Sequence, residues 1–252
     1  MSTVEKALRV LDLFSESQPR LRASEIARML NWDKSTVQRY LSGLTARGLL
    51  EQDRRDKSYT LGAAVTRLAM LRERINPVAA EIKSILSGLV EETGETAHAS
   101  EFTGGELMTT AIIETRIRGT RVYIDASEPL PLHASGSGMA FLSALDDAQL
   151  KLLLGGKLKR FTEHTETRKT RIIDALVTAS RQGYAKSEGT FEQDVVGVAA
   201  PIIGFDDRVV GAVAVAMPVA RFNAVQEKTV AICVKQAAVR LSRLYGASKT
   251  GD

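Results

Sequence analysis

The sequence has few of the features that mark secreted, membrane or zinc-binding proteins. Only one of its 252 residues is a cysteine, Cys233, so the chain can form no internal disulfide and has no cysteine cluster for a structural zinc site. The N-terminus lacks the apolar core of a signal peptide, and no stretch approaches the roughly 18 apolar residues of a membrane-spanning helix. We therefore expect a cytoplasmic protein with no membrane partner, in which Cys233 is a buried and unreactive thiol.

Catalytic signatures are missing as well. The three histidines, His98, His133 and His164, show no metal-ligand spacing among themselves. His133 near Ser135 suggests a hydrolase, but Ser135 does not stand in a G-x-S-x-G elbow. Neither a G-x-G-x-x-G fingerprint nor a Walker loop occurs. The sequence therefore predicts no catalytic residue, no metal and no cofactor.

Positive charge is concentrated near the N-terminus. Residues 1–78 hold 14 Lys and Arg against 9 Asp and Glu, whereas the remaining residues hold 20 against 21. The chain is long enough for two domains with separate cores, and its 44% hydrophobic and 25% charged residues are typical of globular proteins. The basic excess indicates that the N-terminal part faces an anionic partner, such as the phosphates of DNA.

Two short helices joined by a tight turn are predicted between residues 23 and 47. Ser24 is placed to cap the first helix and Asp33 the second, by accepting hydrogen bonds from amides of the first turn. Gly48 is suited to end the second helix, and residues 49–52 and 58–61 then pair as a hairpin around a basic loop. The apolar residues of the second helix recur at spacings of three and four and so face inward: Val37, Tyr40, Leu41 and Leu44. This pattern is typical of a helix-turn-helix with a wing.

The outer face of the second helix and the wing carry the residues that we expect to contact DNA. Gln38 is suited to read adenine, and Arg39 guanine or a phosphate. The alternative is an ordinary three-helix core with a solvated polar face, but a basic wing beside a basic helix favours DNA binding. The predicted DNA-binding residues are Ser24, Lys34, Ser35, Thr36, Gln38 and Arg39 in the helices and Arg54, Arg55 and Lys57 in the wing.

Helices and strands alternate in the rest of the chain. The helix of residues 61–75 ends at Asn76-Pro77, because proline disfavours helix in the residue before it. This helix is the candidate linker between two domains, the second of which is predicted to be an α+β sheet domain. The predicted helices span residues 4–14, 61–75, 78–93, 139–145, 148–154, 169–183 and 227–245, and the predicted strands span 95–101, 107–114, 121–124, 195–203 and 209–217.

A Ser- and Gly-rich turn at residues 133–138 is the first sign of a small-molecule site. It stands at the start of a predicted helix, where free amides and the helix dipole favour an anion such as a carboxylate. The alternative is that the glycines only permit a tight start of the helix.

The predicted strand of residues 209–217 is the second sign, because its side chains alternate in size. Gly197 and Ala199 on the neighbouring strand are also small. The small side chains either let a helix approach closely or form the floor of a cavity with apolar walls. The predicted faces are Val209, Val213 and Val215 on one side and Ala212, Ala214 and Ala216 on the other.

Taken together, these motifs resemble the IclR family of bacterial transcriptional regulators over nearly the whole chain. The resemblance implies a winged helix-turn-helix domain at residues 1–62, a linker helix at 63–77 and a GAF/profilin-like effector domain at 78–247. It also implies a homodimer or homotetramer that binds palindromic promoter sites in double-stranded DNA and responds to a small metabolite. Repression is somewhat favoured over activation. The matching N-terminal motifs are Val4-Glu-Lys-Ala-Leu, Ser24-Glu-Ile-Ala, Lys34-Ser-Thr-Val-Gln-Arg, Leu44, Gly48-Leu-Leu and Tyr59-Thr-Leu-Gly62, and the C-terminal ones are Pro131-Leu-His-Ala-Ser-Gly-Ser-Gly138, Arg160-Phe-Thr, Gly183-Tyr-Ala, Ala199-Ala-Pro201 and Pro218 with Arg221.

The resemblance also carries over an effector site. The family pattern for small keto acids has an acidic residue near Ser187, a thiol at Gly197 and hydroxyls at Ala214 and Ala216, and this sequence departs from it at all four positions. We therefore expect a larger and less polar effector, such as an aromatic or other weakly polar carboxylate or a lactone. The predicted effector-binding residues are His133, Ser135, Gly136, Ser137, Ser187, Gly197, Ala214 and Ala216.

Two alternatives to a ligand-responsive regulator remain at this point. One is an enzyme that acts on a small organic acid and uses its N-terminal domain to dock a partner. The other is a constitutive DNA-binding protein whose second domain only forms oligomers.

Overall fold

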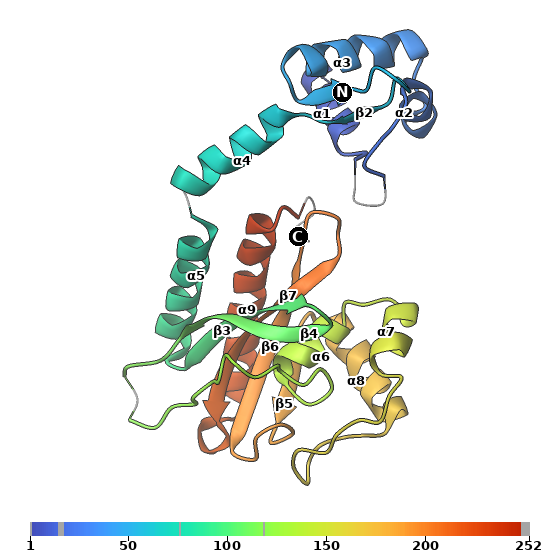
Figure 1. Ribbon diagram of the computed structural model, residues 1–252. Helices are drawn as coiled ribbons and strands as arrows, with labels where there is room; N and C mark the ends of the chain where they lie inside the picture. Colours follow the sequence, from blue (N-terminus) through green and yellow to red (C-terminus); the bar gives the residue numbers. More distant parts are fainter. Residues whose placement is uncertain (1, 15–17, 76, 118, 248–252) are drawn as a thin grey trace. The chain divides into compact units, whose positions relative to one another are not determined.

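A computed structural model describes residues 2–14, 18–75, 77–117 and 119–247 (Figure 1). The chain forms two compact units, Met1–Pro77 and Val78–Asp252. Both helices and antiparallel strands are present, so the predicted α+β class is confirmed. None of the helices within the described ranges combines the length and the apolar character needed to cross a bilayer.

The first unit is a helix-turn-helix with a two-stranded wing, followed by a further helix. Strands β1 and β2 pair antiparallel, and Leu21 forms an isolated bridge with Tyr59. One hydrophobic core joins the first three helices to this hairpin, with Ile26, Leu41 and Leu50 fully buried in it. The elements are α1 (Thr3–Leu11), α2 (Ala23–Leu30), α3 (Lys34–Ala46), β1 (Leu50–Gln52), β2 (Tyr59–Leu61) and α4 (Ala63–Ile75).

The helix ends of this unit confirm one sequence prediction and correct two. Helix α2 begins at Ala23, with Arg22 as its N-cap residue, so Ser24 is exposed in the first turn and does not cap the helix. Asp33 is the N-cap residue of α3, but its side chain makes no capping hydrogen bond to a described amide. Gly48 adopts a positive φ of 69° after α3, and its amide donates to the carbonyl of Thr45, as expected of a helix-ending glycine.

A close backbone approach joins the wing to α4. The amide of Gly62 donates to the carbonyl of Leu49 at 2.9 Å, and a Cβ atom at Gly62 would lie only 2.3 Å from the carbonyl oxygen of Gly48. Only glycine fits at this position, so the sequence Tyr59-Thr-Leu-Gly62 fixes how α4 leaves the hairpin.

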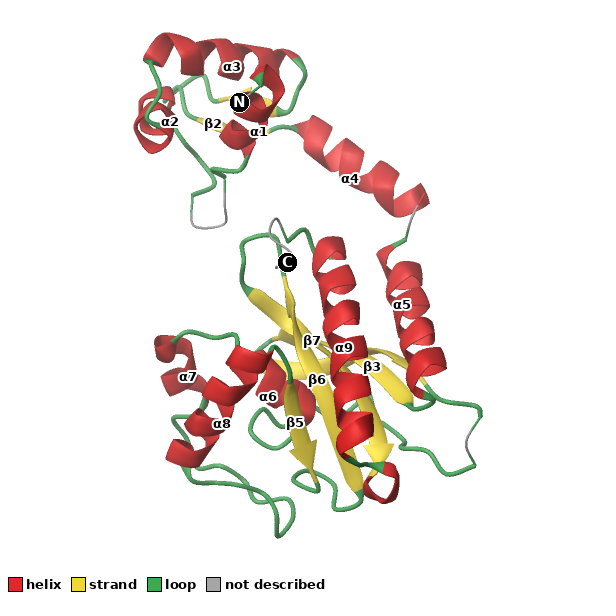
Figure 2. Ribbon diagram, turned by 180° about the vertical axis from the view of Figure 1, so that it is seen from behind, coloured by secondary structure: helices red, strands yellow, loops and turns green. Residues whose placement is uncertain are grey.

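The second unit is a five-stranded antiparallel sheet with helices on both faces (Figures 1 and 2). The strand order is β4-β3-β7-β6-β5. Helices α5 and α9 pack on one face, whereas α6 and α8 pack on the other. The elements are α5 (Val78–Thr93), β3 (Thr96–Thr103), β4 (Glu106–Ile113), α6 (Gly136–Leu142), α7 (Asp147–Leu153), α8 (Lys169–Gln182), β5 (Ala185–Glu188), β6 (Val195–Ile203), β7 (Val209–Pro218), the short 3-10 helix η1 (Val219–Arg221) and α9 (Ala224–Leu244).

The alternation predicted for residues 209–217 holds except at its first position. Val213 and Val215 pack toward α5 and α9, whereas Ala212 and Ala214 face α6. Val209 was predicted to share the valine face, but it packs with the alanines. The cause is a register shift opposite Ile202 and Ile203, which changes the alternation of β7 before Gly211.

Among the local assignments that the sequence prediction gets wrong, three lie around the cavity. Residues 121–124 form no strand. Val122 and Ile124 show the alternation of a strand, but they line a cavity and do not pair with the sheet. The edge strand β5 was missed, since only Ala185 of its four residues is buried. Helix α6 begins three residues earlier than predicted, because Ser135 caps it by accepting a hydrogen bond from the amide of Gly138 at 3.0 Å.

Candidate DNA-binding surface and effector cavity

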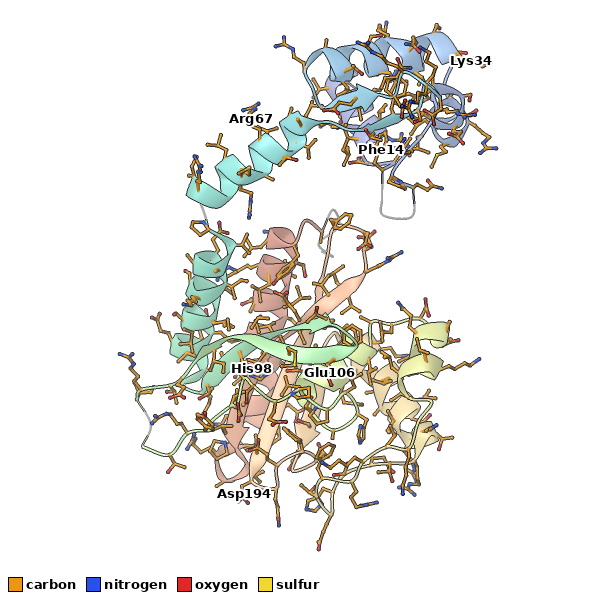
Figure 3. The ribbon with its side chains drawn as sticks, viewed as in Figure 1. Phe14, Lys34, Arg67, His98, Glu106 and Asp194 are labelled. Carbon is orange, nitrogen blue, oxygen red and sulfur yellow. The ribbon has the colours of Figure 1, made fainter. Side chains whose placement is uncertain are left out.

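Helix α3 separates an apolar face from a polar one, as the sequence predicted. Its predicted inward residues, Val37, Tyr40, Leu41 and Leu44, are all buried. On the other face Lys34, Ser35, Gln38 and Arg39 are exposed, and Thr36 is half-buried. Lys34 stands at the start of α3 (Figure 3), and the guanidinium of Arg39 lies 5.3 Å from the centre of the Tyr40 ring.

The wing presents cations at its tip. The carboxylates of Asp53 and Asp56 form hydrogen bonds within the loop. Asp53 accepts from the amide of Arg55 at 2.8 Å, and Asp56 accepts from the amide and the hydroxyl of Ser58 at 2.9 and 2.7 Å. Arg54, Arg55 and Lys57 remain exposed. No described carboxylate forms an ion pair with any of these three residues, nor with Lys34 or Arg39. Their charges are therefore available to an external anion.

A cavity of about 180 Å³ lies on the α6 face of the sheet in the second unit. It is more than ten times as large as the roughly 10–15 Å³ that one water molecule needs. Strands β3, β5, β6 and β7, the start of α6 and the segment of residues 122–130 all contribute to its lining. Seven of the eight predicted effector residues lie together there: Ser135, Gly136, Ser137, Ser187, Gly197, Ala214 and Ala216.

His133 is the predicted effector residue that the structure does not bring to the cavity. Its Nε2 atom lies 2.8 Å from the carbonyl oxygen of Lys159, and its ring lies 5.9 Å from that of Phe161. Chain proximity to Ser135 suggested a shared site. The turn before α6 instead directs His133 toward the loop that contains Lys159, so we leave it out of the site.

His98 is a buried polar residue of the cavity that sequence reasoning missed. It lies on β3 opposite Ala214 (Figure 3), is 6% exposed, and places Nε2 3.0 Å from the hydroxyl of Ser137. Burial lowers the pKa of His98 to about 4, so its imidazole is neutral near pH 7. The Nδ1 atom is buried and has no hydrogen-bond partner among the described residues. The available signal was the polar alternation of Thr96, His98 and Ser100 along β3.

The glycines of the turn before α6 have a packing role. A Cβ atom at Gly136 would lie 2.8 Å from the carbonyl oxygen of Gly197. Glycine therefore lets α6 lie directly on β6, and this supports the alternative of a tight helix start. The amides of Gly136 and Ser137 donate to no described acceptor, and both residues line the cavity.

Two family models match most of the chain. Residues 3–54 match the IclR helix-turn-helix domain, and residues 73–243 match the C-terminal domain of the bacterial transcriptional regulator IclR. The HTH-type transcriptional regulator BhcR of Paracoccus denitrificans is 30% identical over 95% of this chain and 85% of its own length. The HTH-type transcriptional regulator XynR of Escherichia coli is 28% identical over 98% of both chains. A crystal structure of an IclR transcriptional regulator from Silicibacter sp. TM1040 is 33% identical, with a TM-score of 0.71 over 99% of this chain and 98% of that one.

Two more distant relatives also match over nearly the whole chain. The transcriptional repressor IclR of Escherichia coli is 24% identical over 98% of this chain and 90% of its own length. An IclR homologue from Microbacterium hydrocarbonoxydans, crystallised with 4-hydroxybenzoate, is 23% identical with a TM-score of 0.57 over 97% of this chain and 99% of that one. It shares the fold.

The fold and these matches together define a class, that of transcriptional regulators that bind DNA through a helix-turn-helix and respond to a small molecule. Within that class, the chain belongs to the IclR family of bacterial transcriptional regulators. The resemblance seen in its sequence motifs is thereby confirmed.

Proposed function

We propose that the exposed face of α3 reads operator DNA. The observation that carries this proposal is the separation of α3 into a buried apolar face and an outer face with unpaired cations and hydrogen-bonding groups. Lys34, Ser35 and Thr36 lie in its first turn, where a recognition helix meets the major groove. Gln38 and Arg39 have the side chains that bind adenine and guanine edges in pairs of hydrogen bonds.

The wing and the start of α2 contact the DNA backbone in this proposal. Arg54, Arg55 and Lys57 bring three positive charges to phosphates or the minor groove. The hydroxyl of Ser24, exposed in the first turn of α2, is placed to bind a phosphate. These contacts hold the protein on the duplex and make its affinity depend on salt.

The cavity in the second unit binds the effector in this proposal. Apolar side chains, such as those of Val122, Leu130 and Phe191, form much of its lining, and small residues on β6 and β7 leave the space. Such a lining suits a molecule with a larger apolar body and one polar end, an aromatic or other weakly polar carboxylate or a lactone. The 4-hydroxybenzoate in the Microbacterium relative supports an aromatic ligand.

We further propose that two copies of the chain act together on a palindromic site in the cytoplasm, as a homodimer or homotetramer. Helix α4 exposes an apolar stripe of Leu68, Leu71 and Ile75, whose spacing of three and four residues places them on one face. Helix α1 exposes Val4 and Leu8. Apolar stripes of this kind are typical of helix–helix interfaces. Repression is favoured because the Escherichia coli relative is named a repressor.

The effector acts on DNA binding through α4 in this proposal. Residues 63–77 join the helix-turn-helix of residues 1–62 to the effector domain of residues 78–247, so a change in the second domain reaches the first through this segment. Ligand binding then biases the spacing of two paired recognition helices, and this changes operator affinity.

A catalytic role has one feature in its favour, the contact between His98 and Ser137 in the cavity. The pair is poorly suited to hydrolysis. A general base works best with a pKa near the working pH, and the pKa of His98 is about 4. No described carboxylate orients Nδ1, as a catalytic triad requires. We therefore propose that the chain is not an enzyme.

A DNA-retardation assay with the region upstream of the chain's own gene tests the proposed function. The full chain should retard this fragment and not a shuffled one, and the double variant Gln38→Ala/Arg39→Ala should lose the preference. A melting-temperature screen against small organic molecules tests the cavity, because a ligand that binds only the folded state raises stability. Equal retardation of both fragments by the unmodified chain would overturn the proposal.

A further inference from the structure

The cavity has an acidic lining. Asp125, Glu128 and Glu192 are among its described lining residues, which include neither lysine nor arginine. Burial raises the pKa of Glu192. A negatively charged ligand would therefore find acidic residues and no lysine or arginine in the described lining, and would meet only backbone amides, those of Gly136 and Ser137, as partial positive charges.

The cations that are close to the cavity in sequence are engaged elsewhere. Lys186 precedes Ser187 in β5 and so lies on the opposite face of the sheet, where its ammonium group is 3.1 Å from Glu227 of α9. Arg121 precedes Val122 and is 2.8 Å from Glu114. Neither is available to neutralise an anion in the cavity.

An uncharged polar pair lies in the same lining. His98 is buried and neutral, and its Nε2 atom is 3.0 Å from the hydroxyl of Ser137. If Ser137 donates to Nε2, the ring proton is on Nδ1, which is then a donor; if Nε2 donates to Ser137, Nδ1 is an acceptor. The unpartnered Nδ1 can therefore meet either a carbonyl or a hydroxyl group with one hydrogen bond.

We propose that the effector is an uncharged, largely apolar molecule with one carbonyl or hydroxyl oxygen, and that the His98–Ser137 pair binds this oxygen. The inference rests on the proposed function and narrows its ligand class to the uncharged members. A buried ring nitrogen without a partner is unfavourable. A ligand that bonds to it removes this cost, so the pair distinguishes molecules that carry the oxygen from those that lack it.

Matched pairs of probes test the charge preference. Benzamide and benzoate have nearly the same shape, as do methyl 4-hydroxybenzoate and 4-hydroxybenzoate, and only the second member of each pair is anionic. Calorimetric titration of the full chain at neutral pH should show the uncharged member binding roughly tenfold or more tightly. Equal or tighter binding of the anions would overturn the inference. So would binding of none of the four probes, or tighter binding of the cation benzylamine than of benzamide.

A variant of His98 tests the anchoring role. His98→Phe keeps a ring of similar size and removes both nitrogens, so affinity for benzamide should fall about tenfold whereas affinity for toluene, which has no oxygen, should not. The exposed His164 provides the matched control His164→Phe, which should change neither affinity. An equal loss for benzamide and toluene would show that His98 only supports the shape of the cavity.

Nitrogen-15 NMR of the unmodified chain tests the hydrogen bond at His98 without any substitution, so the result does not depend on whether a variant folds. The two ring nitrogen signals of His98 should move when benzamide is added, because a hydrogen bond at Nδ1 changes the tautomer balance. Signals that stay in place while benzamide binds would overturn the inference.

Failure of this inference and failure of the proposed function have different signatures. Release of operator DNA by benzoate and not by benzamide would overturn the ligand class and leave a ligand-responsive regulator. If every probe that binds the cavity leaves operator affinity unchanged, the proposed coupling between cavity and DNA binding would instead be contradicted.

Discussion

Arg39 is the single residue on which operator specificity most depends in this account. Its guanidinium is exposed on α3 and has no described carboxylate partner. If Arg39 reads a base, Arg39→Ala should weaken binding to the specific site by about 1–3 kcal/mol and relax the preference at one base pair. Fluorescence anisotropy with a set of single-base operator variants measures this.

The matched control for Arg39 is Arg171→Ala on the exposed surface of α8, which should leave operator affinity unchanged. Uniform weakening on every sequence by Arg39→Ala would assign Arg39 to a phosphate and remove it from base reading.

His98 predicts an acid sensitivity of the fold. Its pKa falls from 6.5 to about 4 on burial, so between these values the unfolded chain binds a proton that the folded chain does not. The free energy of unfolding should therefore decrease as pH falls from 6.5 to 4, by on the order of 3 kcal/mol, and His98 should contribute no pH dependence above that window. Urea unfolding of the full chain at several pH values measures the decrease.

The comparison for this prediction is His98→Gln, which has no titrating ring and should show a smaller decrease over the same window. An equal decrease in both chains would place the acid sensitivity in other groups.

Gly136 predicts a packing effect. Because a Cβ atom there would lie 2.8 Å from the carbonyl oxygen of Gly197, Gly136→Ala should displace α6 and lower the free energy of unfolding by on the order of 1–3 kcal/mol. Gly43→Ala on α3 is the control, since its Cβ meets no atom within 4 Å and alanine should stabilise the helix by about 0.5–1 kcal/mol. Equal effects of the two variants in urea unfolding would contradict the close packing.

Sequence reasoning located seven of the cavity residues but not the buried imidazole of His98. The small residues Gly197, Ala214 and Ala216 left a visible signal, because their size breaks the usual pattern of a buried strand. His98 left only the polar alternation of β3 as a signal, since its role depends on Ser137, which is 39 residues away in sequence. His133 was included because it is close in sequence to Ser135, but its side chain contacts the carbonyl of Lys159. The local sequence of a tight turn does not determine the direction of each side chain.

At the scale of elements, the wing is the part whose electrostatic role is most directly measurable. The double variant Arg54→Ala/Arg55→Ala removes two exposed cations and leaves Lys57, whose φ of 60° makes that position sensitive to substitution. The slope of log affinity against log salt concentration should become shallower by up to roughly 1.8, since each lost phosphate contact contributes about 0.9. An unchanged slope in salt titrations would show that the wing does not touch the DNA.

Elements with a strong apolar period were predictable, and those shaped by tertiary contacts were not. Helix α5 and strand β6 have many buried residues at helical and alternating spacing. Residues 121–124 show the same alternation as a strand but line the cavity, and β5 is an edge strand with one buried residue. In both cases contacts with residues distant in sequence determine the structure, and the local sequence pattern contains no information about them.

At the scale of the whole molecule, the apolar stripe on α4 predicts self-association. Leu68 and Leu71 are each 48% exposed, so Leu68→Lys/Leu71→Lys should disrupt a helix–helix contact between copies without removing a core residue. Analytical ultracentrifugation should show a smaller species for this variant than for the unmodified chain. The control Arg67→Lys/Arg72→Lys keeps the charge of the same helix and should not change the mass. Identical masses for all three chains would exclude this stripe from the interface.

The central claim is that a molecule in the cavity of the second unit changes how α3 binds DNA. The most direct test measures operator affinity of the full chain with and without the compound that raises its melting temperature most. The account predicts a change of about 5- to 150-fold, the usual range for coupling between two sites, and the loss of this change in a cavity variant such as Ala214→Phe. A compound that binds the cavity and leaves operator affinity unchanged would contradict it.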